Sequence, residues 1–399
     1  MLVYAKRWMV LGLCFALAAC GSDPSPPTAT QPAAVILPPP PPKPITGVTK
    51  TFIAKFDSPW AMTFLPDGRL LVTDNFYKSL SIVTQDGQVT DITGLPERYG
   101  IYDIALSPFY AVDRTIYFTF PSPSPPGTPR NGPYAGDPTI ISGALALATA
   151  QIKQVGLSYS LENLKVIWRQ TPDVVSGGEW GGRIAFSPEK RYLFVTTGDR
   201  AVYYPAKAVD NTLGKIIRLN LDGTVPSDNP FVGTPGALPE IWTLGHRNPY
   251  GLAFAPDGRL WESEHGPKGG DEFNLIVAGQ NYGWPTVSYG DGYDGTPIQK
   301  PAAGDGFAMA AYFWTPAIAP AGMIFYTGSV FADWRGDALL TGLVSKALIR
   351  VHIDGDTAKE VQRIDVGART REVEQGPDGS LWVLTDNPDG ALIKLAPVF

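Results

Sequence analysis

The residues most suited to chemistry are cations at the ends of predicted strands. Arg247, in a His-Arg-Asn-Pro phrase, offers a rigid guanidinium fork that fits a carboxylate or phosphate, and Asn248 beside it offers a donor and an acceptor. Lys346 ends another apolar run, and Arg369 and Arg371 point to the same side of an extended segment, so they can grip one anion together. Taken singly, each is an ordinary surface charge or turn residue. Together they predict a site for a small ligand with several negative charges.

A second polar stretch combines backbone carbonyls with side-chain oxygens. Gly266 and Pro267 leave carbonyl oxygens free, and Asp271, Glu272 and Tyr282 add further oxygen donors. Ca²⁺ selects such a mixture of carbonyl and carboxylate ligands. No contiguous EF-hand loop is present, and solvated loop carboxylates would give the same pattern, so the spacing leaves both interpretations open.

A recurring phrase must position these residues: an apolar run, a Pro-Asp-Gly turn and a second apolar run. Clear copies start at Pro59, Gly181, Tyr250 and Arg371, with looser copies at Tyr102 and near Gly322. Asp-Gly between apolar runs favours a hairpin, because glycine adopts the positive φ of the turn. The longest helical candidate is the stretch 141–153. We therefore predict an all-β fold, a six-bladed β-propeller of four-stranded antiparallel blades, since a β-sandwich would not explain the repeat.

The N-terminal residues 1–19 predict a lipoprotein signal peptide. Lys6 and Arg7 precede an apolar run that is too short to span a bilayer. The run ends in Leu-Ala-Ala-Cys, the form of a bacterial lipoprotein cleavage site, with Cys20 as the lipidated first residue; an ordinary secretory signal or a buried strand is the alternative. Gly21 at the second mature position resembles an outer-membrane address. We therefore expect a cell-envelope protein that faces the periplasm and meets the membrane only through its lipid anchor.

The remaining chain divides into a Pro-rich linker, residues 20–47, and a propeller domain, residues 48–399. Cys14 leaves with the signal and Cys20 carries lipid, so no disulfide is expected in the mature chain. Loss of the two cationic residues in the signal takes the formal net charge from −6 to −8. An acidic chain without basic runs argues against nucleic acid as a partner.

These phrases, in this order, resemble the soluble glucose/sorbosone dehydrogenase family, quinoproteins that use pyrroloquinoline quinone (PQQ) with Ca²⁺. The motifs that carry the resemblance are GKIIRLNLDGTVPSDNPF, GHRNPYGLAF, EHGPKGGDEFNLI and APAGMIFYTG, and the similarity covers essentially the whole domain. The resemblance implies a six-bladed propeller that oxidises an aldose or a related hydroxyl or aldehyde compound and passes the electrons to a quinone or cytochrome.

The resemblance also assigns roles to individual residues. The residues implied to bind PQQ are Arg247, Asn248, Lys346, Arg369 and Arg371. Of these, Arg247 would lie near the reactive quinone oxygens. The carbonyls of Gly266 and Pro267 would hold the calcium beside PQQ. Glu272 and Tyr282 match a second, structural calcium site.

Two positions depart from the family pattern. Where the family has a catalytic histidine four residues before the arginine of an H-x-G-G-R motif, this chain has Glu179, followed by Trp180. A glutamate can act as the general base if burial raises its pKa and if Arg247 or Ca²⁺ offsets repulsion by an anionic cofactor. Arg98 replaces the glutamine of a second family motif, and a long cation there would change the substrate, contact PQQ or pair with Glu179. Arg98 and Trp180 are expected near the substrate. His265 is the alternative base.

Three functions stay open on the sequence. A PQQ- and calcium-dependent dehydrogenase, with Glu179 as base and Arg247 stabilising the reduced quinone, explains why the cationic residues are kept. A non-catalytic propeller that binds PQQ, a sugar or an envelope partner would explain the loss of the histidine. A calcium-dependent lactone hydrolase would leave the cations without a purpose.

Overall fold

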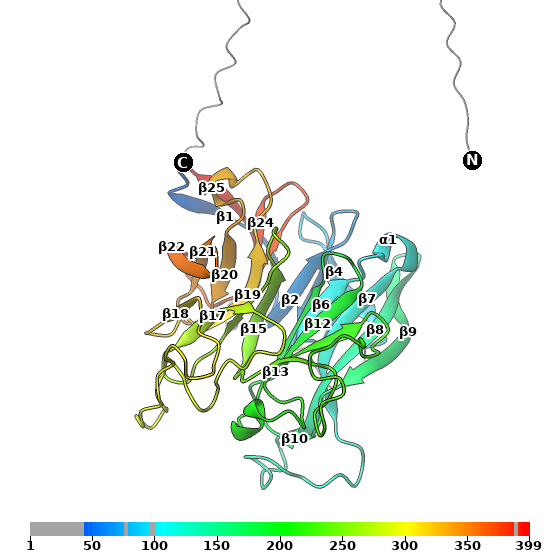
Figure 1. Ribbon diagram of the computed structural model, residues 1–399. Helices are drawn as coiled ribbons and strands as arrows, with labels where there is room; N and C mark the ends of the chain where they lie inside the picture. Colours follow the sequence, from blue (N-terminus) through cyan, green and yellow to red (C-terminus); the bar gives the residue numbers. More distant parts are fainter. Residues whose placement is uncertain (1–43, 76–78, 96–99, 387–389) are drawn as a thin grey trace, which may run out of the picture. The chain divides into compact units, whose positions relative to one another are not determined.

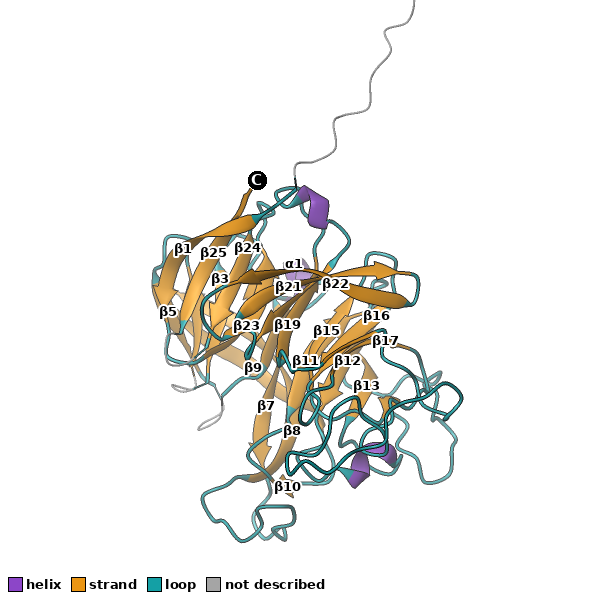
Figure 2. Ribbon diagram, turned by 90° about the vertical axis from the view of Figure 1, so that its left-hand side faces the viewer, coloured by secondary structure: helices purple, strands orange, loops and turns teal. Residues whose placement is uncertain are grey.

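The described part of the chain, residues 44–75, 79–95, 100–386 and 390–399 of a computed structural model, is built almost wholly from β-strands (Figure 2). The strands of the first three blades are β2 (Pro59–Phe64), β3 (Leu70–Asp74), β4 (Ser79–Val83) and β5 (Val89–Thr93); β6 (Asp103–Leu106), β7 (Thr115–Pro123), β8 (Ser142–Val155) and β9 (Ser158–Arg169); and β11 (Gly181–Phe186), β12 (Tyr192–Thr197), β13 (Lys215–Asn220) and β14 (Ile241–Leu244).

The other three blades are β15 (Pro249–Phe254), β16 (Leu260–Glu264), β17 (Asp271–Ile276) and β18 (Tyr312–Trp314); β19 (Pro320–Phe325), β20 (Ala338–Gly342), β21 (Ala347–Asp354) and β22 (Thr357–Asp365); and β23 (Thr370–Gln375), β24 (Leu381–Thr385), β25 (Ala391–Val398) and β1 (Gly47–Lys55). The short elements are β10 (Val174–Val175), α1 (Tyr110–Asp113), η1 (Tyr204–Lys207) and η2 (Ala332–Trp334). Within the described ranges, no helix has the length and apolar character that a membrane crossing requires.

The blades close into a ring, which confirms the predicted six-bladed propeller. Their innermost strands contact one another in the order β2, β6, β11, β15, β19, β23 and back to β2. The last blade takes its outer strand from the N-terminal end of the described chain, because β1 pairs antiparallel with β25, as Figure 1 shows. This pairing fastens the ring where the chain begins and ends.

The recurring turn forms as predicted in the clear copies of the repeat, where it joins the first two strands of a blade, whereas the short helices α1 and η2 lie at this place in the second and fifth blades. In the first blade the backbone N–H of Leu65 donates to Arg69 O, and Gly68 between them has φ +85°. Gly258 occupies the same position in the fourth blade with φ +88°, and Lys190 takes φ +60° in the third, where the repeat lacks glycine. The turn geometry therefore persists through the substitution, although a left-handed lysine is less favourable than glycine.

Burial between blades holds the ring together. Six separate apolar clusters each lie between two neighbouring blades, so the molecule has one apolar layer per blade interface rather than a common core. The stretch 141–153, the longest helical candidate, is the strand β8. Its residues from Ala144 to Ala148 are all buried, because each face of the strand packs against a neighbouring blade.

The innermost strands are bulged at one end, where the site lies. Register shifts interrupt β2, β11, β15, β19 and β23 within their first few residues. A bulge redirects side chains and strengthens the local twist. The long loops gather beyond this region, near β10 and β13 in Figure 2. We call the space framed by these bulged strand ends and the loops above them the funnel.

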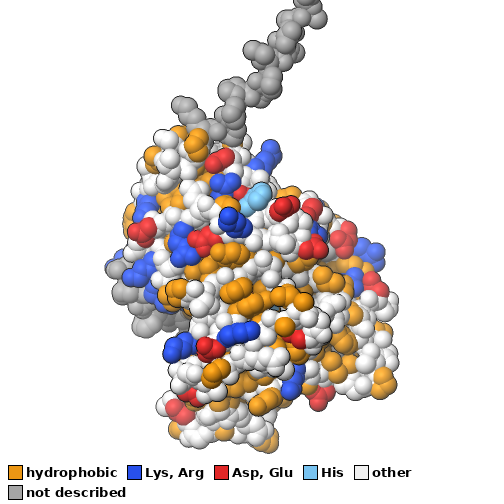
Figure 3. Space-filling view, turned by 60° about the vertical axis from the view of Figure 1, so that its left-hand side comes forward, with side chains coloured by type: hydrophobic (Ala, Val, Ile, Leu, Met, Phe, Trp, Pro, Cys, Tyr) orange, Lys and Arg blue, Asp and Glu red, His pale blue; other side chains and the backbone are white. Residues whose placement is uncertain are grey.

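Several predictions concern residues outside the described ranges: the signal peptide, the lipidated Cys20, the linker as far as residue 43, and Arg98. Of the predicted linker, Ile45 is described, and it is buried among the residues of the fifth and sixth blades. Acidic and basic side chains are mixed over the face of the protein shown in Figure 3. This mixture accords with the lack of basic runs in the sequence.

Acidic residues inside the ring should make stability depend on pH. Arg183 forms ion pairs with both Asp103 and Glu372. Glu374 lies close to these carboxylates, and its burial, followed by the charge of Glu372, raises its pKa to about 8. Since an unfolded glutamate titrates near pH 4.3, the folded state binds this proton more tightly, and stability should fall as pH rises from about 4.3 to 8.

Glu374→Gln is expected to remove this loss. The difference in free energy of unfolding between the variant and the wild type should grow with pH by at most about 1.4 kcal/mol per pH unit in that window, the value for one proton. Urea unfolding at pH 5, 6.5 and 8 measures this difference. A difference independent of pH would contradict the assignment.

Candidate active site

Glu179 and Arg247 meet in the funnel, although they lie in different blades. An oxygen of Glu179, Oε1, accepts a hydrogen bond from Arg247 Nη2 at 2.7 Å. The glutamate side chain is 23% exposed and the arginine side chain 5%, so the carboxylate faces the funnel while the guanidinium lies beneath it. Glu179 has φ +49°, a left-handed conformation that is uncommon outside glycine and that aims this side chain.

The chain around Arg247 fixes its guanidinium. Nη1 donates to Gly266 O at 2.9 Å, and the backbone N–H of Arg247 donates to Glu264 Oε2 at 2.6 Å. Burial lowers the pKa of Arg247, but the charge of Glu179, followed by that of Tyr293, more than offsets this effect and leaves it above its ordinary value. Arg247 is therefore a permanent positive charge in the funnel.

Arg369 and Arg371 do reach one anion together, as their spacing predicts, and the anion is Asp386. Arg371 Nη2 lies 2.6 Å from Asp386 Oδ2, and Arg369 approaches the same oxygen at 3.3 Å. The guanidinium of Arg371 lies over the ring of Trp60, with Cζ 3.7 Å from the ring centroid. Lys346 is exposed in the turn between β20 and β21. The sequence offered no signal for Asp386 as the shared partner.

Aromatic side chains from several blades form the floor of the funnel. Trp60, Tyr102 and Tyr250 occupy equivalent positions of their repeats, and the Trp60 ring lies 5.5 Å from Tyr102 and 6.3 Å from Tyr250. Trp180, predicted near the substrate, is 3% exposed and lies 5.5 Å from Tyr102, so it belongs to this floor. Aligning the repeats would have found these aromatics. A floor of this kind suits a flat, conjugated ligand.

His265 lies in the wall of the funnel, beside Gly266, and is held neutral. Nε2 of His265 donates to Pro320 O at 2.7 Å, which leaves Nδ1 to accept from Asn248 Nδ2 at 3.4 Å. Burial, followed by the charge of Arg247, lowers the pKa of His265 to about 3. Because both ring nitrogens are engaged, the geometry favours Glu179 over His265 as the base. Asn248 also accepts a hydrogen bond from Gly181 N, next to the segment that carries Glu179.

Two cavities open at the funnel mouth. One, of about 430 Å³, is lined by Arg247, Pro267, Trp284 and Tyr293 among others, and a second, of about 690 Å³, shares Pro267 and Tyr293 and extends to Gly266. Each is large enough for a small ligand. Of the residues predicted for the site, Arg247, Gly266, Pro267 and His265 line these cavities, together with the aromatic rings of Trp284 and Tyr293; Glu179, Lys346, Arg369 and Arg371 are not among the lining residues.

Comparison with known proteins identifies the family. A family model described as glucose / sorbosone dehydrogenase matches residues 56–394. The chain belongs to the glucose/sorbosone dehydrogenase family. It is 34% identical over 355 residues to an aldose sugar dehydrogenase of Escherichia coli (strain K12), a match that covers 86% of this chain and 91% of that protein.

Solved structures agree with this membership. The apo-form of the soluble aldose sugar dehydrogenase of Escherichia coli superposes with a TM-score of 0.80 at 32% identity, covering 88% of this chain and all of that one. The PQQ-bound form of an aldose sugar dehydrogenase from Streptomyces coelicolor superposes with a TM-score of 0.67 at 26% identity, covering 89% of this chain and all of that one. Membership of the glucose/sorbosone dehydrogenase family supports an oxidoreductase that acts on sugars.

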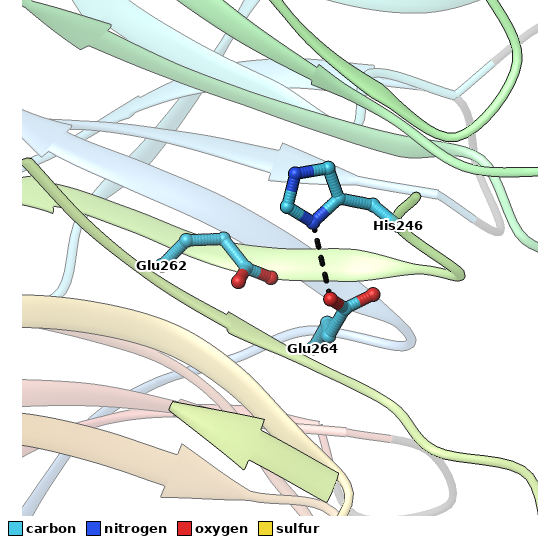
Figure 4. A group of neighbouring side chains, drawn as sticks. All are labelled: His246, Glu262 and Glu264. Atoms are coloured by element: carbon cyan, nitrogen blue, oxygen red, sulfur yellow. Dashed lines mark hydrogen bonds and ion pairs between the residues drawn. The ribbon is translucent and has the colours of Figure 1, made fainter. Parts of the chain in front are cut away.

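This glucose/sorbosone dehydrogenase family member has a buried acidic cluster behind Arg247, which the sequence indicated only through Glu272. Figure 4 shows His246 facing Glu262 and Glu264, two residues of β16 on the same side of the strand. One ligand atom from each of the three lies within 4.8 Å of the others. Asn274 on β17 donates to Glu262 at 3.1 Å and to Glu272 at 3.3 Å. The alternation of side chains along β16 and β17 brings three carboxyl groups and an amide together.

The cluster has more oxygen acceptors than the surrounding donors can satisfy with hydrogen bonds. Glu262 Oε1 and Asn274 Oδ1, both fully buried, accept no hydrogen bond from any residue that the structure describes. Burial, followed by the charge of Glu264, raises the pKa of Glu262 and Glu272 well above their ordinary values. The Tyr282 hydroxyl donates to Leu275 O, so the carbonyl is the atom with which Tyr282 could bind a cation.

Asp199 is a site residue that the sequence interpretation missed. Its Oδ2 accepts from Trp284 Nε1 at 2.7 Å, and its backbone N–H donates to Arg247 O at 2.8 Å. Burial raises the pKa of Asp199 to about 7, while the charge of Arg247 lowers it. Asp199 thus ties Arg247 to a residue that lines the funnel mouth. Its place two residues after the end of β12 was the available signal.

Proposed function

We propose that this protein oxidises an aldose or a related hydroxyl or aldehyde compound with PQQ and Ca²⁺. The observation that carries the proposal is the Glu179–Arg247 pair, a carboxylate held at 2.7 Å by a buried cation inside the cationic, aromatic-floored funnel. Such a pair supplies a general base in the place where the family resemblance expects one.

The residues present fit PQQ. PQQ is a planar tricarboxylate, and its ring system matches an aromatic floor while its carboxylates match Arg369, Arg371 and Lys346. Arg247 and Asn248 lie where the third blade leads into the fourth, and they would contact the cofactor from the opposite side of the ring to Arg369 and Arg371 of the sixth blade. The PQQ-bound form of the aldose sugar dehydrogenase from Streptomyces coelicolor supports PQQ as the cofactor.

The chain's own residues would take up the substrate proton and stabilise the charge that develops in the reaction. Glu179 Oε1 is engaged by Arg247, which leaves Oε2 to take the proton of the substrate hydroxyl. The ion pair with Arg247 fixes the direction of the carboxylate. Bound PQQ supplies the two-electron acceptor, and Arg247, fixed from behind by Glu264, stabilises negative charge that develops beside it.

Two places suit Ca²⁺. The first is at the carbonyls of Gly266 and Pro267, although Gly266 O already accepts from Arg247, so calcium there would use its second lone pair. The second is the cluster of Glu262, Glu264 and Glu272, whose orphaned buried oxygens fit a hard cation. A lipid-anchored, periplasmic location and a quinone or cytochrome as electron acceptor complete the proposal.

The function is tested by titrating PQQ into the chelator-treated protein with and without Ca²⁺, followed by a dye-linked screen of sugars. Calcium-dependent binding near one equivalent, together with sugar-dependent dye reduction, is the expected result. Binding without turnover on any sugar would favour the non-catalytic propeller. Lactone hydrolysis without PQQ would favour the hydrolase.

Calcium is expected to stabilise the fold through the acidic cluster. At a free Ca²⁺ concentration of 100 times Kd, binding to the folded state adds about 2.7 kcal/mol. Thermal unfolding with Ca²⁺ and with chelator should therefore differ for the wild type, and much less for Glu262→Gln. Glu189→Gln, at an exposed turn position, is the matched control and should respond like the wild type. An equal calcium response in all three proteins would contradict this site.

A further inference from the structure

The segment that presents Glu179 is rich in glycine and has few side chains that could fix its backbone. It reads Ser-Gly-Gly-Glu-Trp-Gly-Gly from Ser176 to Gly182, and a side chain added at Gly177 or Gly178 would meet no neighbour within 4 Å. Glycine-rich segments lose much conformational entropy when they become ordered. Something must therefore hold this segment, or the carboxylate would not stay where Arg247 meets it.

The side chain of Arg200 makes that connection. Its Nη2 donates to Ser176 O at 2.9 Å and its Nε to Gly178 O at 3.3 Å, while its Cζ lies 3.1 Å from the centroid of the Trp180 ring. The backbone N–H of Arg200 also donates to Glu179 O at 3.2 Å. Arg200 thus contacts the residues on both sides of Glu179 as well as its own carbonyl.

Arg200 is anchored independently of the segment. Nη1 donates to Gly143 O in β8 at 3.2 Å, which ties the guanidinium to the neighbouring blade. Arg200 itself has φ +57° and is the second residue of the turn from Asp199 to Val202, which follows β12. The planar fork of an arginine reaches several carbonyls at fixed angles, which a lysine cannot do.

Burial of the Arg200 charge is energetically unfavourable, which indicates that this arginine has a specific role. Arg200 is fully buried, and the acceptors of its guanidinium are carbonyls rather than carboxylates. Burial lowers the pKa of Arg200 to about 9, although nearby tyrosines and Asp199 favour its charged form. A buried charge of this kind is unfavourable unless its hydrogen bonds are made.

We propose that Arg200 is a positioning residue that holds the segment around Glu179 so that its carboxylate stays paired with Arg247 and aimed into the funnel. The role rests on the proposed function, since it acts through the general base. Arg200 is not among the residues that line either cavity at the funnel mouth, so its effect on turnover would pass through Glu179.

The test is a double-mutant cycle between Arg200 and Glu179. Arg200→Met is expected to lower kcat roughly 10²-fold, the effect of a misplacement of about 1 Å, with little change in PQQ affinity. In the Glu179→Gln background, Arg200→Met should cause almost no further loss, because there is no base left to misplace. A merely structural role would instead lower activity by the same factor in both backgrounds.

Arg218→Met is the matched control. Arg218 is also a buried arginine of the same blade, stacked 3.7 Å from the centroid of the Tyr192 ring, but it pairs with Asp228, away from the funnel. This variant should lose stability and keep its kcat at temperatures where it is folded. Arg200→Lys, which keeps the charge without the fork, serves where Arg200→Met does not fold, and it should show the same dependence on Glu179.

Equal losses with and without Glu179, or a kcat for the Arg200 variants equal to that of Arg218→Met, would overturn the positioning role. These outcomes are separate from failure of the proposed function, which is shown by a wild type that binds PQQ or sugar without turnover. The wild type and Glu179→Gln are therefore measured first.

Discussion

Glutamine in place of Glu179 is expected to lower kcat by roughly 10²- to 10⁴-fold, the range that general-base catalysis contributes. The amide oxygen of glutamine can still accept the hydrogen bond from Arg247, so the shape of the funnel should persist, but the amide cannot take a proton from the substrate. PQQ affinity should change little. Dye-linked turnover and calorimetric PQQ titration of the same preparation check both parts of this expectation.

Two results would count against this role for Glu179. Turnover equal to that of the wild type would assign the proton transfer to another group, with His265 the first to examine despite its engaged nitrogens. Loss of PQQ binding together with turnover would make Glu179 part of the cofactor site. Glu189→Gln controls for the loss of one carboxylate at an exposed position.

Replacing Arg371 by methionine should weaken PQQ binding by roughly 30-fold or more, because truncating one member of a buried charge pair costs about 2–5 kcal/mol. Arg371 is 6% exposed and approaches Asp386 at 2.6 Å. Without Arg371, the negative charge of Asp386 would also face the carboxylates of the cofactor. The measurement is the PQQ dissociation constant at saturating Ca²⁺.

Arg350→Met is the control for this second expectation. Arg350 also pairs with carboxylates, those of Asp333 and Asp337, but it lies in the fifth blade on β21, away from the residues that line the funnel. Its replacement should lower stability and leave PQQ affinity unchanged. Equal PQQ affinity in the Arg371 and Arg350 variants would remove Arg371 from the cofactor site.

Short-range chemistry explains why so much of the fold could be predicted. The Pro-Asp-Gly turns and the apolar runs beside them depend on neighbours along the chain, and both formed as expected, even where Lys190 replaces glycine. The common anion of Arg369 and Arg371 likewise follows from the alternation of extended backbone, although its identity as Asp386 does not. The stretch 141–153 became a strand because burial between two blades outweighed its helical pattern.

The sequence by itself determined the repeat, the turn chemistry and the residue types available for a cationic site, since each depends on local geometry. Only the tertiary structure decided that Glu179 meets Arg247 across two blades, that the carboxyl groups of β16 face His246, and that Arg200 holds the segment before β11. Those contacts join positions far apart in the chain. They arise when six apolar interfaces close the ring, and no local pattern encodes which side chains that closure brings together.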